Sequence, residues 1–169
     1  INSWRKKVVS PSALNKYNNC SLQFYYHYLA NLKIDSEVDE YADASTMGTA
    51  IHDALDSNYP VGVITERDVA NMTIKILADI ENNYAEILSE QAMEEGKNYL
   101  SLQIARKLTN NFLELEQQLI IAANKQNQKI EIIDKEVELS SSLFVDGNVF
   151  NLIGKADRVD FEGDTLRII

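Results

Sequence analysis

An aspartate and a histidine are the first residues in this sequence whose types and surroundings suggest chemistry. Asp157 stands in a segment of alternating apolar and polar residues, and His52 stands in a segment with helical apolar spacing that ends before Pro60. Carboxylate oxygens and imidazole nitrogens bind divalent cations, and the same groups can transfer protons. Their joint action depends on the elements that position them.

The alternation over 149–161 predicts a strand. On one face of it Asp157 would lie beside Lys155, among apolar neighbours. Burying an uncompensated carboxylate is costly, so Asp157 would be paired, hydrogen-bonded or bound to a metal. An ion pair between Asp157 and Lys155 or an arginine, on a solvated face of the sheet, explains the same spacing, because most charged side chains are solvated. The local sequence leaves both interpretations open.

His52 is predicted to lie on a helix over 46–59, four residues before Asp56. A contact between residues i and i+4 would orient the imidazole or favour its charged form. The alternative is an ordinary packed or surface histidine, which is the commoner role of a lone histidine on a helix.

A second predicted strand, over 130–139, carries two further carboxylates. Glu136 and Glu138 share one of its faces. Acidic residues on a strand next to Asp157 would complete a divalent-cation site.

The first three-quarters of the chain is predicted to be helical. Ser10 and Pro11 are typical of a helix start, as N-cap and first helical residue. The helix that follows carries an aromatic-rich stripe that is expected to face the core. A loop over 35–45 separates it from the helix over 46–59. The stripe consists of Leu14, Tyr17, Phe24 and Tyr28.

Two longer helices are predicted next. Thr65 and Asp68 resemble a capping box with aspartate in the glutamate position, and helical spacing then continues for about five turns. Another helix is predicted over 97–125. The residues expected to face inward are Val69, Met72, Ile76, Ile80 and Tyr84 in the first helix, and Leu102, Ala105, Leu108, Phe112, Leu115 and Leu119 in the second.

After Gln128 the apolar pattern changes to that of strands. Asp146 and Gly147 are a strong signal for a two-residue hairpin. The strands are expected over 130–139, 149–161 and 165–169. The last strand stops without a turn residue or a polar tail, which suggests a domain cut in the middle of its sheet.

The expected fold class is α+β, with several helices packed on a mostly antiparallel sheet. One domain is expected over 1–169, mainly helical over 1–127 and a β-meander over 128–169.

Composition limits the class of protein. The chain is 45% hydrophobic and 25% charged, which suits one soluble, compact domain, and no apolar run approaches the roughly 20 residues of a membrane span. The 16 Lys and Arg against 26 Asp and Glu give a net charge of −10. This balance alone argues against nucleic-acid binding, which depends on Lys and Arg neutralising phosphates.

The number of cysteines indicates in which cellular compartment the chain is expected and which cofactors it can bind. With Cys20 as its one cysteine, this chain cannot form an internal disulfide or a cysteine-rich zinc or iron–sulfur site, and a reducing cytoplasm is expected. The motifs of P-loop enzymes, dinucleotide-binding proteins, zincins and serine hydrolases are also missing from the sequence.

Taken in order, three groups of residues resemble the PD-(D/E)XK nuclease superfamily. The most similar branch is the RecB/AddB-like nuclease domain of ATP-dependent helicase–nucleases. The order and spacing of the groups extend over nearly the whole chain. They are Ser10-Pro11-Ser12-Ala13-Leu14 with Tyr17, Cys20 and Phe24-Tyr25-Tyr26, then Gly48-Thr49-x-x-His52, then Gly154-Lys155-Ala156-Asp157-Arg158-Val159-Asp160.

The resemblance implies a restriction-endonuclease-like core and hydrolysis of DNA phosphodiesters with Mg²⁺ or Mn²⁺. His52 matches the helical histidine that helps to bind the metal, and Asp157 matches the first carboxylate of the catalytic signature. Glu136 corresponds to an acidic residue on the preceding strand. The metal would polarise the scissile phosphate and activate water. DNA is the implied substrate, and a helicase domain or subunit is the implied partner.

The family's signature continues with an acidic residue, any residue and a lysine on the next strand. The acidic residue is expected directly after Ile169, so the sequence as given lacks the catalytic lysine. We expect it to be catalytically incompetent while its parent protein is an exonuclease. Some members of the branch carry an iron–sulfur cluster with one early and three late cysteines. Cys20 lies near the early position, but the late ones are missing, so no cluster is expected.

Two other functions remain open. The first is a degenerate nuclease fold that binds DNA or a helicase without cleavage. The second is a structural interaction domain in which His52 and Asp157 are ordinary polar residues. A shared metal requires these two side chains to lie within about 8 Å of each other. The acidic charge is compatible with a nuclease if a helicase portion or the missing end supplies the DNA-binding surface.

Overall fold

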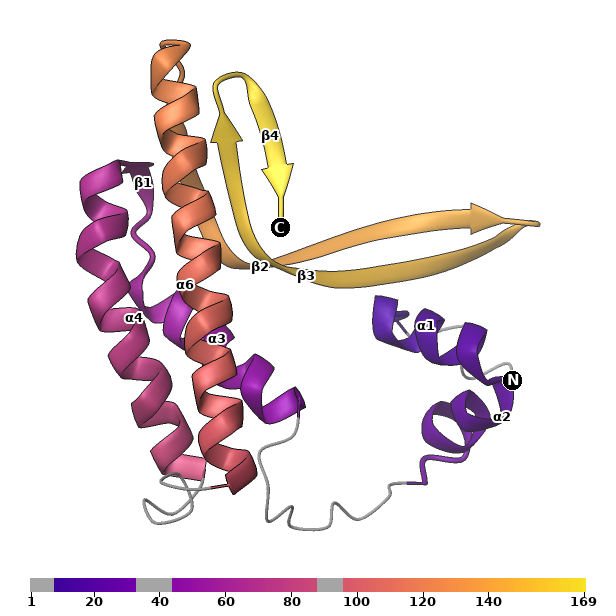
Figure 1. Ribbon diagram of the computed structural model, residues 1–169. Coiled ribbons are helices and arrows are strands. Elements are labelled where there is room, and N and C mark those ends of the chain that lie inside the picture. The colour runs from indigo at the N-terminus through magenta and orange to yellow at the C-terminus, as the bar shows by residue number, and fades with distance from the viewer. Residues whose placement is uncertain (1–7, 33–43, 88–95) are drawn as a thin grey trace. The chain divides into compact units, whose positions relative to one another are not determined.

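The computed structural model describes residues 8–32, 44–87 and 96–169 of the chain (Figure 1). The chain divides into two compact units. Unit 1 comprises Ile1–Glu37 and Glu136–Ala156, and unit 2 comprises Val38–Lys135 and Asp157–Ile169. Most of the loop predicted over 35–45 lies outside the described residues, and the following helix begins at Ala44.

Unit 2 contains three helices in the described residues: α3 (Ala44–Asn58), α4 (Glu66–Ile87) and α6 (Gly96–Lys125). Helices α4 and α6 run side by side (Figure 1). The predicted capping box starts α4, because Asp68 Oδ2 accepts hydrogen bonds from the Thr65 amide at 2.9 Å and from the Thr65 hydroxyl at 2.6 Å. The Asp68 amide in turn donates to Thr65 Oγ1.

The inward face predicted for α4 is confirmed. All five residues of its stripe are buried, and Ile76, Ile80 and Tyr84 have no exposed surface. With Ile130 and Ile132 they belong to the main hydrophobic core. Burial of such side chains contributes roughly 1.5–3 kcal/mol each to folding.

The inward face predicted for α6 is wrong over most of its length. Leu102 and Ala105 are buried, but Leu108, Phe112, Leu115 and Leu119 are exposed. The stripe that faces the core is displaced round the helix and includes three polar residues, which the apolar pattern excluded. It consists of Asn98, Leu102, Ala105, Thr109, Leu113, Glu116, Ile120 and Ala123.

The strands form one sheet in the order β1-β2-β3-β4. The pairs β1–β2 and β3–β4 are antiparallel. An α+β fold is therefore confirmed. The short first strand was not predicted, and the second is longer than predicted. The strands are β1 (Gly62–Ile64), β2 (Ile130–Val145), β3 (Asn148–Glu162) and β4 (Thr165–Ile168).

The hairpin between β2 and β3 turns at Asp146 and Gly147, as predicted. Their φ angles of 47° and 73° are both positive, as a type I′ turn requires. A third positive φ, 55°, occurs at Glu136 within β2. A left-handed residue inside a strand is typical of a β-bulge.

Unit 1 contains α1 (Pro11–Asn19), the short α2 (Ser21–Phe24) and the π-helix η2 (Tyr25–Leu29). Ser10 caps α1 as predicted, since its hydroxyl accepts from the Ala13 amide at 3.2 Å. The single continuous helix predicted here is wrong. The backbone is extended at Cys20, which ends α1 and caps α2.

The core of unit 1 is small. Val9, Ala13 and Phe24 are its buried residues, whereas Leu14 and Tyr17 of the predicted stripe are exposed. Val9 also bonds to β3, donating to the carbonyl of Asn151 at 2.8 Å. The break at Cys20 changes the direction of the chain, so a stripe drawn for one straight helix cannot stay on one face.

Within the described residues, no helix combines the length and the hydropathy needed to cross a membrane.

Candidate metal centre

The structure brings His52 and Asp157 together within unit 2. Nε2 of His52, on α3, lies 3.4 Å from Oδ1 of Asp157, on β3. The side chains are 36% and 64% exposed, so solvent reaches both. Asp157 is thus not the buried carboxylate that its apolar neighbours suggested.

The second imidazole nitrogen also faces a carboxylate. Nδ1 of His52 lies 3.3 Å from Oδ1 of Asp53. The recorded partner of Asp56 is a lysine, so the predicted contact between His52 and Asp56 stays a prediction. Asp56 Oδ1 pairs with Lys135 Nζ at 3.3 Å, and the same ammonium donates to the Asp56 carbonyl oxygen.

Several contacts fix α3, which carries His52. Ala50 and Ala54 are almost completely buried, and such small side chains let the helix backbone pack closely. Asn83 of α4 donates to the Ala50 carbonyl at 3.0 Å. Lys135, at the unit 2 end of β2, attaches the last turn of α3 through Asp56. The helix face with His52 is therefore held against the strands.

Strand alternation positions Asp157. Its neighbours Ala156 and Arg158 are buried, and so is Asp160. Because successive side chains point to opposite faces, the inward direction of Arg158 turns Asp157 outward.

His52 and Asp157 have the chemistry of a divalent-cation site. A carboxylate and an imidazole suit Mg²⁺ or Mn²⁺, and the pair offers one oxygen and one nitrogen ligand atom. Two ligand atoms on one Mg²⁺ at about 2.1 Å in octahedral geometry lie about 3 Å apart. The observed 3.4 Å needs only a small adjustment.

A comparison with protein-family models gives one decisive result: the model of the PD-(D/E)XK nuclease superfamily matches residues 8–169. The chain belongs to this superfamily. No curated protein and no solved structure matches it. The superfamily resemblance is confirmed, and the α+β architecture is consistent with a restriction-endonuclease-like fold. The RecB/AddB-like branch stays a prediction.

A buried network of charged side chains lies on the inward face of β3, the strand that carries Asp157. The sequence did not predict this network. Arg158 bonds Glu116 of α6 at 3.0 Å and Asp160 at 2.8 Å. Arg167 of β4 reaches Asp160 at 2.6 Å. The signal that could have shown it is the pattern of an inward arginine and aspartate two residues apart in a strand, with a glutamate at a core position of α6.

Tyr59 covers this network. The Arg158 guanidinium lies 5.1 Å from the centre of the Tyr59 ring, within cation–π range. Burial raises the pKa of Tyr59, and the Glu116 carboxylate acts in the same direction, so the phenol stays neutral. Arg158 thus has two carboxylates and an aromatic face as partners.

Glu136, the third predicted ligand, belongs to unit 1. There its carboxylate pairs with Lys155. This pair also replaces the alternative ion pair between Lys155 and Asp157. Glu136 enters the metal centre only as a proposed ligand.

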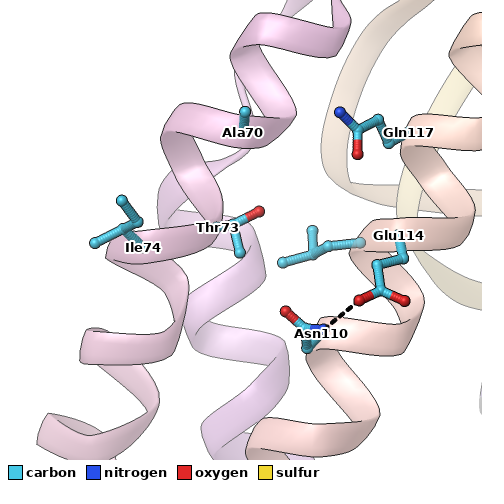
Figure 2. Close-up of a pocket in the computed structure, with 7 residues that line it drawn as sticks. Ala70, Thr73, Ile74, Asn110, Glu114 and Gln117 are labelled. Atoms are coloured by element: carbon cyan, nitrogen blue, oxygen red, sulfur yellow. Dashed lines mark hydrogen bonds between the residues drawn. The ribbon is translucent and has the colours of Figure 1, made fainter.

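A cavity of about 220 Å³ is lined by residues of α4 and α6. Figure 2 shows the side chains that line it. Its one carboxylate, Glu114, accepts a hydrogen bond from Asn110 at 2.6 Å. The other lining side chains offer amide, hydroxyl and apolar groups. This surface carries no candidate for nuclease chemistry.

Proposed function

We propose that the protein is a metal-dependent DNA exonuclease that hydrolyses phosphodiester bonds. The observation that supports this most strongly is the 3.4 Å approach of His52 Nε2 to Asp157 Oδ1, from elements about a hundred residues apart in the chain. A nuclease family and a histidine–carboxylate pair exposed to solvent together favour hydrolysis of a charged polymer.

The proposed ligands of the metal are His52, Asp157 and Glu136, and Asp157 is the proposed catalytic carboxylate. Glu136 is proposed from the resemblance of the sequence, in which an acidic residue lies on the strand that precedes the strand of Asp157. Mg²⁺ is the proposed ion and Mn²⁺ a substitute, because both accept oxygen-rich sites. When bound, such an ion acts as a Lewis acid toward a phosphate oxygen and favours deprotonation of water.

The residues of the chain have distinct tasks in this proposal. Asp157 supplies negative charge on the solvent side of the sheet, where a cation is attracted. His52 offers a nitrogen ligand, and Asp53 beside Nδ1 favours a proton on that nitrogen. The lone pair of Nε2 is then left facing Asp157.

The order of the three sequence motifs supports placing the protein in the RecB/AddB-like branch, with a helicase domain or subunit as partner and DNA repair or recombination as its process. A cytoplasmic location is part of this proposal. Cys20 is exposed and is the one cysteine of the given sequence, and an iron–sulfur cluster is not part of the proposal.

The test is a nuclease assay on the full-length protein with end-labelled linear DNA and a closed circular DNA of the same sequence. We expect cleavage of linear DNA with Mg²⁺, none with EDTA, and none by the Asp157→Ala variant. The circular DNA should stay intact if the enzyme needs an end. DNA binding without cleavage in any metal would contradict the proposal and favour the degenerate, non-cleaving fold.

A further inference from the structure

The first helices of the chain differ from the rest in charge. Residues 1–34 hold five of the 16 Lys and Arg and none of the 26 Asp and Glu. In the described part of this segment, residues 8–32, Lys16 is the one charged side chain at neutral pH. A polyanion would be repelled by the acidic remainder of the chain, but not by this segment.

The same segment exposes aromatic rings. Four of the eight tyrosines lie within residues 17–28. Tyr17, Tyr25 and Tyr26 are 55%, 50% and 47% exposed. Tyrosine has an apolar ring and a polar end, so it is found where a partner covers the ring.

Each of these rings packs against a neighbouring ring. Tyr17 packs edge-on against the buried Phe24, with the ring centres 5.3 Å apart. Tyr25 and Tyr26 pack against each other in the same way at 5.6 Å. Rings held in this manner lose little freedom when a partner stacks on the open face.

The backbone contributes to the arrangement. Tyr25 and Tyr26 begin the π-helix η2, in which the Ala30 amide donates to the Tyr25 carbonyl at 2.9 Å. Single π-turns are rare and frequently occur at functional sites. A cation lies over another ring of the same segment, because Lys16 Nζ is 5.8 Å from the centre of the Tyr28 ring.

We propose that Tyr17, Tyr25 and Tyr26, with Lys16, form a platform on which the unpaired bases of single-stranded DNA stack. This inference rests on the proposed function and adds to it the form of the substrate. Proteins that bind single strands without sequence preference combine aromatic rings with cations, because every base has a π-face and every nucleotide a phosphate. Bases inside a duplex are already stacked and do not offer that face.

The first test is fluorescence anisotropy with a labelled oligothymidylate, using the full-length protein in EDTA so that no metal-dependent cleavage occurs. Tyr25→Ala and Tyr26→Ala should each weaken binding about 5- to 150-fold, the range measured for loss of one stacked base. Phenylalanine at either position should restore most of the affinity, since it keeps the ring.

Two matched controls separate stacking from other effects. Tyr99 is 48% exposed on α6, outside the segment, and Tyr99→Ala should bind as the wild type does. Leu22 is 59% exposed within the segment but has no ring, so Leu22→Ala should also bind normally. A loss at Leu22 as large as at Tyr25 would indicate apolar docking of a protein and would overturn the inference.

A second measurement does not depend on folding of the variants. Photo-crosslinking of a 5-iodouracil strand should label peptides within residues 17–28. Labelling confined to other peptides, equal competition by duplex DNA, or unchanged affinity of the tyrosine variants would each overturn the platform. Asp157→Ala should keep wild-type binding while losing cleavage. The platform and the proposed nuclease can therefore fail independently.

Discussion

The two faces of β3 in unit 2 use charged residues in opposite ways. On the inward face, Arg158 and Asp160 are buried and joined to Glu116 and Arg167 by short ion pairs. On the outward face, Asp157 is 64% exposed and faces His52. Four consecutive residues of one motif, 157–160, thus hold both kinds of group.

The two faces of β3 therefore differ in how much their charged residues contribute to the stability of the fold. A buried charge that loses its partner is costly, so Arg158 and Asp160 depend on each other for the fold. An exposed contact between polar or charged side chains contributes about 0–1 kcal/mol to stability, so the contact of His52 with Asp157 is not needed to hold β3 in place. The inward network fixes the strand, and the outward pair carries the proposed metal site.

The largest expected effect comes from breaking the inward network. Asp160→Ala removes a completely buried carboxylate and leaves Arg158 and Arg167 without their shared partner. We expect a loss of about 3–5 kcal/mol in the free energy of unfolding, measured by urea denaturation. Asp157→Ala is the control on the opposite face and should change stability by about 0.5 kcal/mol or less. Equal losses would remove the distinction between the two faces.

A second contrast tests the inward face of α6. Leu113 is 1% exposed and Leu115 is 59% exposed, two residues apart on one helix. Leu113→Ala should destabilise the protein by about 2–5 kcal/mol, and Leu115→Ala by about 0.5 kcal/mol or less. The measurement is again the unfolding midpoint in urea. If Leu115→Ala lowered the free energy of unfolding more than Leu113→Ala, the buried face of α6 would be the one that the sequence pattern predicted.

The contrast between α4 and α6 shows what the sequence could predict. In α4 the apolar stripe and the buried stripe coincide, so periodicity identified the core residues. In α6 apolar residues occupy more than one face, and the buried face includes Thr109 and Glu116. Glu116 is inward because Arg158 on a distant strand neutralises it, and no local pattern contains that information.

The sequence predicted the candidate site only in part, as it did the buried faces of the helices. Motif order identified His52 and Asp157 as candidates, and their approach is a property of the fold. Helix spacing predicts a contact between His52 and Asp56, but the carboxylate of Asp56 forms an ion pair with Lys135 of β2. Tertiary ion pairs of this kind compete with an i,i+4 preference worth only about 0.2–0.5 kcal/mol.

On the outward face, His52→Ala should weaken metal use without unfolding the protein. We expect the Mg²⁺ concentration for half-maximal cleavage to rise roughly tenfold or more, the loss seen even when an outer-shell group of a metal site is removed. The measurement is a Mg²⁺ titration of cleavage by the full-length protein. His27→Ala, at the other histidine, is the control. An unchanged titration curve for His52→Ala would exclude it as a ligand.

The smallest effect concerns the capping box of α4. Hydrogen bonds from Thr65 hold the pKa of Asp68 below its ordinary value. The carboxylate therefore stabilises the fold above the unfolded pKa of about 3.9, and this contribution is lost as the pH falls through the lower folded value. Asp68→Ala should cost about 0.5–1 kcal/mol at neutral pH in urea denaturation. The difference from wild type should shrink below about pH 4, and a constant difference would contradict the capping role.

The most direct test of the proposed metal centre asks which of the two histidines in this sequence, His27 or His52, coordinates the ion. Electron spin echo modulation of Mn²⁺ bound to the full-length protein detects a coordinated imidazole nitrogen. We predict coupling to one histidine nitrogen in the wild type and in His27→Ala, and its loss in His52→Ala. Nitrogen coupling that persists in His52→Ala, or is missing from the wild type, would contradict a shared metal site of His52 and Asp157.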